Sequence, residues 1–430
     1  MPTVPRAIGG TLRGFPAGFW WLWSSTLVNR LGTFVFPFLT LYLTVRRGYS
    51  ATEAGLVLSL YGVGSAAGVL LGGELTDRVG RRSTMVWAQV ATAAATAALG
   101  LVTQAAAIAA LVLAVGVAAA VSRPAVSAMI SDLMPPADRL RAFAVNYWAI
   151  NIGFGLSAVV AGFIAQQGYI WLFVGDAATT LACAVLMRVK LAETRPAAGK
   201  ASPTAADRPS APAVAATRVL RDGRFMALTA LAFALWLVFF QGGTSLPLVM
   251  SDHGLGSHEY GLVIGLNGLL IVVLQIPVTR LVKGRDPGRS LALGALLIGG
   301  GFGLTAFAGS ATLVYAATVV VWTVGETVYA PASAAVVAEL APDHARGRYQ
   351  GVFGFGTSAA TCLAPLAGGL ILDHGGSAPL WGGCAVLGTV AAVAFLLILP
   401  AKRRAPTPPS APRPGDRSGA EELSAEAAAG

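Results

Sequence analysis

Four ionisable side chains lie inside long apolar stretches of the chain, where they are best placed to do chemistry: Arg30, Arg123, Asp176 and Glu326. Ionisable groups are costly inside a bilayer, where they mark substrate paths or proton relays. A dry cavity favours the protonated form of a carboxyl group, whereas a nearby arginine favours the ionised form. A carboxylate that alternates between such surroundings can take up and release a proton near neutral pH. We therefore expect Asp176 and Glu326 to carry protons, with Arg30 and Arg123 as counter-charges or substrate contacts. The alternative is a fixed structural ion pair.

Neutral polar side chains in the same stretches form a second group of candidates: Asn29, Asn151, Gln241, Asn267 and Gln275. Interhelical hydrogen bonds of about 0.6 kcal/mol each account for such residues in membrane helices. Asn151 and Gln241 are the better candidates for the wall of a substrate cavity. An aromatic run is formed by Trp236, Phe239 and Phe240. This run either lines an apolar cavity or packs against lipid.

The elements that must position these residues are predicted to be membrane-spanning helices. Hydrophobic residues make up 55% of the 430 residues, and charged residues only 12%. A soluble domain carries roughly 25% charged residues, so this chain has too little charge to cover a globule in water. A bilayer core about 30 Å thick takes roughly 20 residues of helix. Twelve apolar runs meet that length: 17–45, 52–73, 83–102, 105–134, 140–166, 169–190, 224–251, 258–282, 289–308, 312–340, 346–372 and 377–399. We predict an all-α membrane protein with twelve transmembrane helices.

The basic residues predict how these helices are oriented. With the N-terminus in the cytoplasm, 26 of the 30 Lys and Arg residues fall on the cytoplasmic side, and only Arg46 and Arg47 fall outside. Cytoplasmic loops of membrane proteins carry such an excess of Lys and Arg. We therefore expect both termini to be cytoplasmic. The net charge of +10 is explained by topology, and we expect no nucleic-acid partner.

The sequence repeats itself at an offset of about 206–207 residues. Residues 53–62 read EAGLVLSLYG and residues 259–268 read EYGLVIGLNG, with six of ten positions identical. Pro124 recurs as Pro331 at the same offset. Parallel repeats of this kind build transporters whose halves rock around a site at the bilayer midplane. The predicted organisation is a six-helix half at 1–192, a cytoplasmic linker at 193–217, a second six-helix half at 218–401 and a disordered cytoplasmic tail at 402–430.

The loop expected after the second run reads GELTDRVGRRSTM over residues 73–85. It resembles the signature of the major facilitator superfamily between helices two and three, G-x-L-a-D-R-x-G-R-K/R. Glycine at position 73 lets a neighbouring helix approach, and glycine at position 80 permits a tight turn. The resemblance implies that Asp77 and Arg81 form a charge network with Asp132, which holds the first half against helix eleven in the outward-facing state. The residues expected to form this conformational gate are Gly73, Asp77, Arg78, Gly80, Arg81 and Asp132.

Within that superfamily the chain is similar to the twelve-helix, proton-coupled drug efflux branch. The similarity lies in residues 29–39 (NRLGTFVFPFL), in the run from Arg123 to Asp132 and in residues 325–331. The antiporter signature of helix five keeps small residues from Gly153 onward but lacks its proline. The usual arginine of helix four is absent near Val112.

The resemblance implies a secondary active transporter that exports lipophilic or amphipathic small molecules, such as drugs, by proton antiport. One alternative is a proton symporter that imports a metabolite, and another is a lipid flippase of the same fold. A further alternative is a membrane sensor or scaffold that has lost transport.

Glu326 is the stronger candidate for the proton carrier, because the equivalent position of the first half is Ala119. A carboxylate is costly inside a bilayer, so its presence in the second half alone indicates that this position of the second half has a function. No nucleotide-binding pattern G-x-x-x-x-G-K-[ST] occurs, and no nucleophile–base pair or metal-spaced cluster stands out. We therefore predict neither an enzyme nor a cofactor or metal site. The expected partners are a small-molecule substrate, protons and membrane lipids, for a monomer in a bacterial inner membrane.

Overall fold

The structure is a computed structural model that describes residues 14–194, 219–282, 284–342 and 345–399. Within these residues, twelve helices are long and apolar enough to cross a membrane. Each predicted run corresponds to one of them, so the prediction of an all-α membrane protein with twelve spans is confirmed. The predicted tail at 402–430, and all but the first residues of the predicted linker at 193–217, lie outside the described residues.

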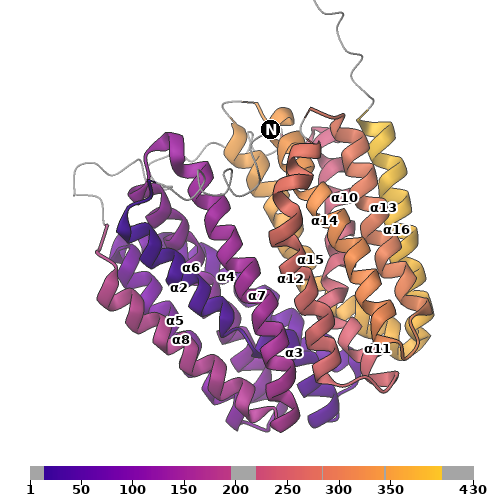
Figure 1. Ribbon diagram of the computed structural model, residues 1–430, viewed down its shortest axis with the longest axis horizontal. Coiled ribbons are helices and arrows are strands. Elements are labelled where there is room, and N and C mark those ends of the chain that lie inside the picture. The colour runs from indigo at the N-terminus through magenta and orange to yellow at the C-terminus, as the bar shows by residue number, and fades with distance from the viewer. Residues whose placement is uncertain (1–13, 195–218, 283, 343–344, 400–430) are drawn as a thin grey trace, which may run out of the picture.

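The first half is a bundle of six spans (Figure 1). Its α-helices are, in chain order, α2 (Ala17–Leu31), α3 (Val35–Leu41), α4 (Ala51–Val79), α5 (Arg81–Leu101), α6 (Ala105–Leu133), α7 (Arg139–Gln167) and α8 (Ile170–Lys190). A π-helical turn (Tyr42–Arg46) extends α3. Within the bundle, α6 packs against α4 and α5, and α8 packs against α5 and α2. Helix α2 also packs against α7.

The second half repeats these pairings. Its α-helices are α10 (Gly223–Thr244), α11 (Leu246–Asp252), α12 (Ser257–Val282), α13 (Pro287–Leu304), α14 (Thr312–Leu340), α15 (Arg346–Gly375) and α16 (Ser377–Ile398). Here α14 packs against α12 and α13, and α16 packs against α13 and α10. Helix α10 also packs against α15. Each contact has its counterpart in the first half, so the two halves have the same architecture.

The first span of each half is interrupted, which the sequence prediction of continuous runs at 17–45 and 224–251 did not include. Helix α2 ends at Leu31 and α3 begins at Val35, while α10 and α11 are separated by Ser245. Each second piece carries a proline in its first turn, Pro37 in α3 and Pro247 in α11. A proline suits the first turn, because the backbone N–H groups there have no partner within the helix.

The two halves touch along two helix pairs, α4 with α15 and α7 with α12. Glycines make both contacts close. A Cβ atom at Gly55 would overlap the carbonyl oxygen of Pro365, and one at Gly268 would lie 2.7 Å from the carbonyl oxygen of Asn151. The contact at Gly55 lies near loop 47–50, and the contact between α7 and α12 extends from Gly268, near the middle of α12, to Gly162 and Ser257 beside loop 253–256. We call the end of the molecule with these two loops the far end.

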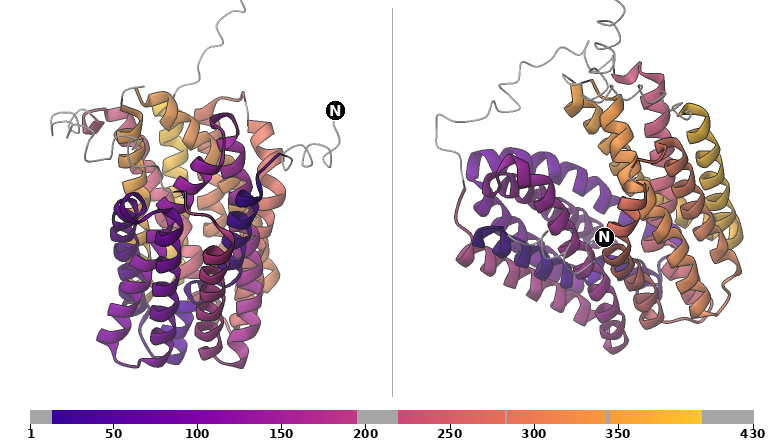
Figure 2. Two further views of the ribbon diagram at one scale, coloured as in Figure 1. Left: turned by 90° about the vertical axis from the view of Figure 1, so that its left-hand side faces the viewer. Right: turned by 45° about the horizontal axis from the view of Figure 1, so that its top comes forward.

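The halves diverge toward the other end (Figures 1 and 2). We call it the basic end, because it carries Arg78, Arg81 and Arg82 around Gly80, and Arg139 and Arg141 at the start of α7. A Cβ atom added at Gly73 of α4, or at Gly347 or Gly351 of α15, would meet no neighbour within 4 Å. The structure is therefore a conformation that is closed at the far end and open at the basic end.

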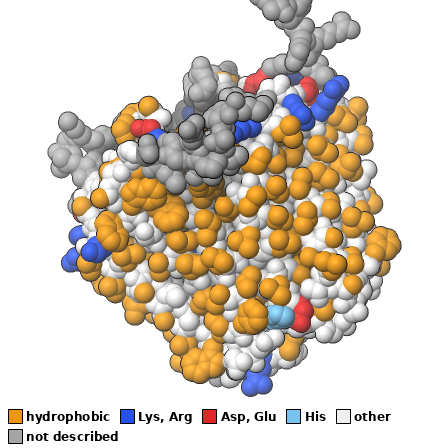
Figure 3. Space-filling model, in the orientation of Figure 1, with side chains coloured by type: hydrophobic (Ala, Val, Ile, Leu, Met, Phe, Trp, Pro, Cys, Tyr) orange, Lys and Arg blue, Asp and Glu red, His pale blue; other side chains and the backbone are white. Residues whose placement is uncertain are grey.

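The outer surface suits a lipid environment. Figure 3 shows one face of the molecule, on which hydrophobic side chains spread over most of the area while Lys and Arg lie toward its edges. Large apolar side chains are exposed on the spans, including Leu70 at 79%, Trp87 at 69% and Val273 at 67%. In water such an area would be an aggregation hazard, whereas the acyl chains of a bilayer solvate it.

Candidate functional site

Three of the cavities formed by the described residues adjoin one another, within the first half and between the two halves. The N-half cavity, of about 80 Å³, is walled by α2, α3, α4, α5, α6 and α8. The C-half cavity, of about 250 Å³, is walled mainly by α10 and α12, with further residues from α3, α4, α7, α14 and α15. Both are lined by Phe36 and Tyr61, whose ring centroids are 4.5 Å apart. An entrance cavity of about 390 Å³ shares Arg30 and Arg123 with the N-half cavity and extends toward the basic end.

Glu326 lies on α14 in the wall of the C-half cavity. One carboxylate oxygen, Oε2, accepts a hydrogen bond of 3.1 Å from Nδ2 of Asn267, which also donates to Oγ1 of Thr323 at 3.0 Å. Within the described part of the chain the carboxylate makes no ion pair. Tyr147, on α7 of the other half, is close enough to interact with Glu326 electrostatically. A carboxyl group with one neutral partner in an apolar wall can exist protonated or ionised, as proton exchange requires.

The apolar part of this cavity is aromatic. Its ring-bearing residues are Phe36, Tyr61, Phe154, Phe239, Phe240, Tyr260 and Trp322. Of the aromatic run predicted from the sequence, Phe239 and Phe240 line the cavity, whereas Trp236 does not. Aromatic walls supply a large apolar contact area and accept ligands of many shapes.

Asp176 is placed at the interruption of the first span. Its Oδ2 accepts a hydrogen bond of 3.1 Å from the backbone N–H of Val35, and its Oδ1 accepts one of 3.3 Å from the hydroxyl of Thr180. The side chain is buried, at 8% exposure. The carboxylate thus satisfies the first N–H of α3, a structural role that the sequence prediction of a proton carrier did not include. A negative charge is stabilised at a helix N-terminus.

The two arginines both face the cavities. Arg30 lies in the last turn of α2 and Arg123 on α6, and each lines the N-half and the entrance cavities. Neither guanidinium makes a hydrogen bond or an ion pair with another residue in the described part of the chain. The structure therefore does not bring either arginine into direct contact with Asp176 or Glu326, and the expected counter-charge pairs are not formed in this conformation.

The two neutral candidates differ in position. Asn151 lines the C-half cavity, and its Nδ2 donates to the carbonyl oxygen of Tyr147 at 2.9 Å. Gln241 lies outside the three cavities that we describe. Its Nε2 donates to the carbonyl oxygen of Ala364 at 3.0 Å, and its Oε1 accepts from the hydroxyl of Ser245 at 2.6 Å. Gln241 therefore ties the α10–α11 interruption to α15, which corrects its expected place in the cavity wall.

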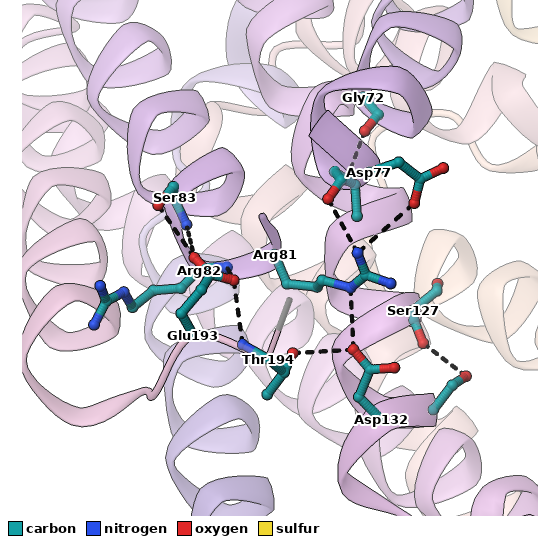
Figure 4. Close-up of polar contacts among 11 residues, drawn as sticks. Gly72, Asp77, Arg81, Arg82, Ser83, Ser127, Asp132, Glu193 and Thr194 are labelled. Atoms are coloured by element: carbon teal, nitrogen blue, oxygen red, sulfur yellow. Dashed lines mark hydrogen bonds and ion pairs between the residues drawn. The ribbon is translucent and has the colours of Figure 1, made fainter. Parts of the chain in front are cut away.

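Three of the expected gate residues, Asp77, Arg81 and Asp132, lie together at the basic end of the first half (Figure 4). Arg81 Nε lies 3.0 Å from Asp132 Oδ2, and Arg81 Nη1 lies 3.7 Å from Asp77 Oδ1. The predicted network of these three residues is thus present in the structure, although Asp132 is the nearer partner. Arg78 instead pairs with Glu74 at 2.7 Å, on an exposed surface.

The signature segment is mostly helix, which corrects the expected loop after residue 73. Helix α4 continues to Val79 and α5 begins at Arg81, so that Gly80 alone makes the turn. Its φ of 108° is in the region that favours glycine. No neighbouring helix approaches Gly73 here, because the halves are apart at this end.

Two residues that the sequence assigned to the linker belong to this network. Glu193 accepts hydrogen bonds of 3.1 Å from the backbone N–H groups of Arg82 and Ser83, in the first turn of α5. Thr194 donates to Asp132 Oδ2 at 3.0 Å. Partial burial raises the pKa of the Glu193 carboxyl, but the hydrogen bonds from Ser83 and Arg82 outweigh it and hold the pKa below its usual value. The feature of the sequence that could have indicated this contact is an acidic residue, Glu193, shortly after the sixth span ends at Lys190.

These groups supply hydrogen-bond donors, hydrogen-bond acceptors and charges to the cavity walls. Among the described residues no group of three or more His, Cys, Asp or Glu side chains is arranged to hold a metal ion. Twelve spans in two matching halves, with ionisable groups around a central cavity, define a secondary transporter.

Comparison with known proteins gives the family. The model of the Major Facilitator Superfamily matches residues 22–326 and 243–426. The chain therefore belongs to the major facilitator superfamily, and it is a transporter and not an enzyme.

Relatives and solved structures agree with this assignment. The chain is 27% identical over 349 residues to the uncharacterized MFS-type transporter YttB of Bacillus subtilis, covering 80% of this chain and 85% of the relative. It is 23% identical over 393 residues to the multidrug resistance protein MdtH of Aeromonas salmonicida, covering 91% and 96%. A POT family transporter in complex with 5-aminolevulinic acid superposes with a TM-score of 0.70 at 17% identity, covering 90% and 96%. A D-xylose-proton symporter superposes with a TM-score of 0.72 at 15% identity, covering 89% and 97%. These structures share the fold.

Proposed function

We propose that this transporter exports lipophilic or amphipathic small molecules, such as drugs, in exchange for protons. The observation that carries the proposal is the carboxyl group of Glu326, which lies in the wall of an aromatic cavity with no ion pair among the described residues. The aromatic walls of the cavity can bind an apolar cargo, and the carboxyl group can bind and release a proton. The similarity to the multidrug resistance protein MdtH supports export.

The orientation follows from charge. The basic end faces the cytoplasm, because Lys and Arg accumulate in cytoplasmic loops. Both termini are then cytoplasmic, and the protein resides as a monomer in the bacterial inner membrane. In this orientation the entrance cavity opens to the cytoplasm, where an exporter loads its cargo.

Proton entry supplies the energy for export. Each proton that enters contributes about 2.3 kcal/mol per 100 mV of membrane potential and about 1.4 kcal/mol per unit of pH difference. To use this energy, Glu326 must be protonated from the outside and must release the proton to the cytoplasm. The opening and closing of the basic end changes the water around Glu326, and water stabilises the ionised carboxylate.

The network of Arg81 acts as the gate in this cycle. In the open conformation Arg81 is held within the first half by Asp132 and Asp77. When the basic end closes, α15 approaches α4 near Gly73, where no side chain obstructs it. The carboxylate of Asp77 can then face the positively polarised N-terminus of α15. This contact favours the conformation that is open to the outside.

Glu326→Gln provides the test of proton coupling. This change fixes the side chain in a neutral form of similar shape, so we expect purified protein in vesicles to lose transport driven by a pH gradient. Exchange of labelled substrate at equal pH should persist, because cargo can still bind. The matched control is Asp132→Asn, which should slow exchange as well. Wild-type pH-driven accumulation by Glu326→Gln would place the proton site elsewhere, and Asp176→Asn would be examined next.

The direction of transport is tested in the same vesicles. For an antiporter, an outward pH gradient and an inward pH gradient should drive the cargo in opposite directions, each against the flow of protons. Cargo movement in the same direction as the protons would instead establish symport. 2-Naphthalenesulfonate and its uncharged sulfonamide, which share one apolar body, are suitable first cargoes.

A further inference from the structure

We propose that the cargo carries a negatively charged group, which Arg30 and Arg123 bind, on an apolar body that occupies the C-half cavity. The proposal deepens the proposed function, on which it rests for the statement that the bound molecule is cargo. It follows from a property of the N-half cavity, namely two guanidinium groups that face one space and have no partner among the described residues.

The charge of the N-half cavity is the first argument. Its charged lining residues are Arg30, Arg123 and Asp176. The Asp176 carboxylate is already bound by the N–H of Val35 and the hydroxyl of Thr180. The two guanidinium groups have no hydrogen bond or ion pair with any described residue. The charge of Arg123 acts on Arg30 electrostatically, and the side chain of Tyr61 acts on Arg30 in the opposite sense. Two unpaired positive charges that share a cavity repel each other, and an anion between them removes that cost.

The chemistry of arginine is the second argument. A guanidinium presents several N–H donors in a plane, and it binds carboxylate, sulfonate or phosphate oxygens with charge-assisted hydrogen bonds. A guanidinium carries no hydrogen-bond acceptor, so a donor group on the cargo cannot form a hydrogen bond with it. A cationic cargo would add a third positive charge beside Arg30 and Arg123.

The continuity of the cavities is the third argument. Phe36 and Tyr61 line both the N-half and the C-half cavities, so a molecule that reaches past these two rings extends from one into the other. The N-half cavity has polar walls that include Asn29 and Gln89, and at about 80 Å³ it accepts a small charged group. The aromatic C-half cavity of about 250 Å³ accepts a ring system.

An anionic cargo also fits the energetics of export. An inside-negative membrane potential drives an anion out of the cell and a proton into it. The exchange of one for the other therefore draws on the potential twice, whereas the exchange of a cation for a proton moves no net charge.

The test compares three probes with one apolar body and different charge: 2-naphthalenesulfonate, its uncharged sulfonamide and 2-naphthylmethylammonium. Affinity is measured by equilibrium dialysis at pH 7, with the full chain in nanodiscs of phosphatidylcholine. We expect the sulfonate to bind at least tenfold more tightly than the sulfonamide, and the ammonium to bind more weakly than both. A tenfold ratio corresponds to about 1.4 kcal/mol, which is close to the lower limit for one hydrogen bond to a charged group.

Variants assign the effect to the cavity. Arg30→Gln and Arg123→Gln should each weaken sulfonate binding about tenfold and leave sulfonamide binding unchanged, which also shows that the variant is folded. Arg30→Lys and Arg123→Lys keep the charge and should recover part of the affinity. The matched control is Arg46→Gln, which removes an exposed arginine at the far end and should leave all three affinities unchanged.

Several outcomes overturn the proposal. These are equal affinity for the three probes, binding of none of them, a preference for the ammonium, and a sulfonate preference that survives in both glutamine variants. Failure of the proposed function gives a different result. If proton-driven flux is absent while the sulfonate preference depends on Arg30 and Arg123, the anion site stands and proton-coupled export does not.

Discussion

At the scale of single residues, three carboxylates show how the surroundings decide what an acid does. Glu326 has one neutral hydrogen-bond partner in a cavity wall, Asp176 is held by a helix N-terminus and a hydroxyl, and Asp132 binds a cation. All three were candidate functional residues by sequence. Only Glu326 is left with the freedom to change its protonation state without breaking a structural contact. This distinction favours Glu326 over Asp176 as the proton carrier.

The unequal distances from Arg81 to its two partners lead to a prediction. Asp132→Asn removes the nearer partner, at 3.0 Å, whereas Asp77→Asn removes the one at 3.7 Å. We expect both to reduce transport, but Asp132→Asn should lower the thermal unfolding midpoint more, by a few degrees. The double variant should be less than additive, because the three residues share one network. Additive effects on the unfolding midpoint would show that the two carboxylates act independently.

Glu193 provides a prediction about pH. Because the pKa of its carboxyl is lowered in the folded protein, the ionised form contributes stability above the unfolded-state pKa, and this contribution is lost as the pH falls through the lowered value. Glu193→Gln should therefore reduce the unfolding midpoint at pH 7, where a helix cap is worth about 0.5–2 kcal/mol. At about pH 3, below the ordinary glutamate pKa of about 4.3, the difference should shrink. An equal difference at both values of pH would exclude a role for the charge.

At the scale of elements, α4 and α15 are joined at the far end by a contact between the halves. Asp373, in the last turn of α15, accepts hydrogen bonds from the backbone N–H groups of Ala51 at 3.1 Å and Thr52 at 2.8 Å, at the start of α4. Nearby, a Cβ atom at Gly369 would overlap the carbonyl oxygen of Ala51. The carboxylate of one half thus caps a helix of the other, and this contact must break when the far end opens.

Asp373→Asn should therefore shift the protein toward the conformation that is open at the far end. A charge at an exposed helix N-terminus contributes about 0.3–1 kcal/mol, so we expect a two- to fivefold change in the ratio of the two conformations. Spin labels at the far ends of α4 and α15 would measure it as a second, longer distance. Glu53→Gln is the matched control, since Glu53 caps the same helix from within its own half. The same shift in both variants would mean that the contact between the halves has no special part.

At the scale of the whole molecule, the twelve spans form two matching halves that touch at the far end and part at the basic end. The contacts between the halves are made by small residues on α4, α7, α12 and α15. Contacts of this kind hold two helices close without interlocking side chains, so one half can rock against the other. The cavities lie between and within the halves, and the rocking motion would expose them to one side at a time.

Orientation in the membrane is tested on the whole molecule. Ala137 lies in an exposed turn at the basic end and Ala311 in an exposed turn at the far end. In a background without the native cysteines, a membrane-impermeant maleimide added to intact cells should label Ala311→Cys and miss Ala137→Cys. After the membrane is permeabilised, both should be labelled. Labelling of Ala137→Cys alone in intact cells would reverse the orientation and the proposed direction of loading.

Much of this protein follows from local sequence. A run of about 20 apolar residues must form a helix in a bilayer, because each backbone polar group there needs a partner within the segment. The twelve spans and their repeat are therefore readable from composition and spacing, whereas the turn at Gly80 is shorter than the loop that the sequence predicted. The cluster of Asp77, Arg81 and Asp132 could also be predicted, because the resemblance of residues 73–85 to a family signature carries a known arrangement with it.

The tertiary structure alone decided which side chains meet across helices. Asp176 and Val35 are 141 positions apart in the chain, and Asp373 and Ala51 are 322 apart; no local pattern predicts such contacts. The same holds for Gln241, which bonds to α15, and for Arg30 and Arg123, which face one cavity and have no ion pair within the described part of the chain. A helix in lipid presents an apolar surface on every side, so periodicity does not tell which face is turned inward. The packing of the helices makes that choice, and it thereby determines which ionisable groups are bound and which remain free to act.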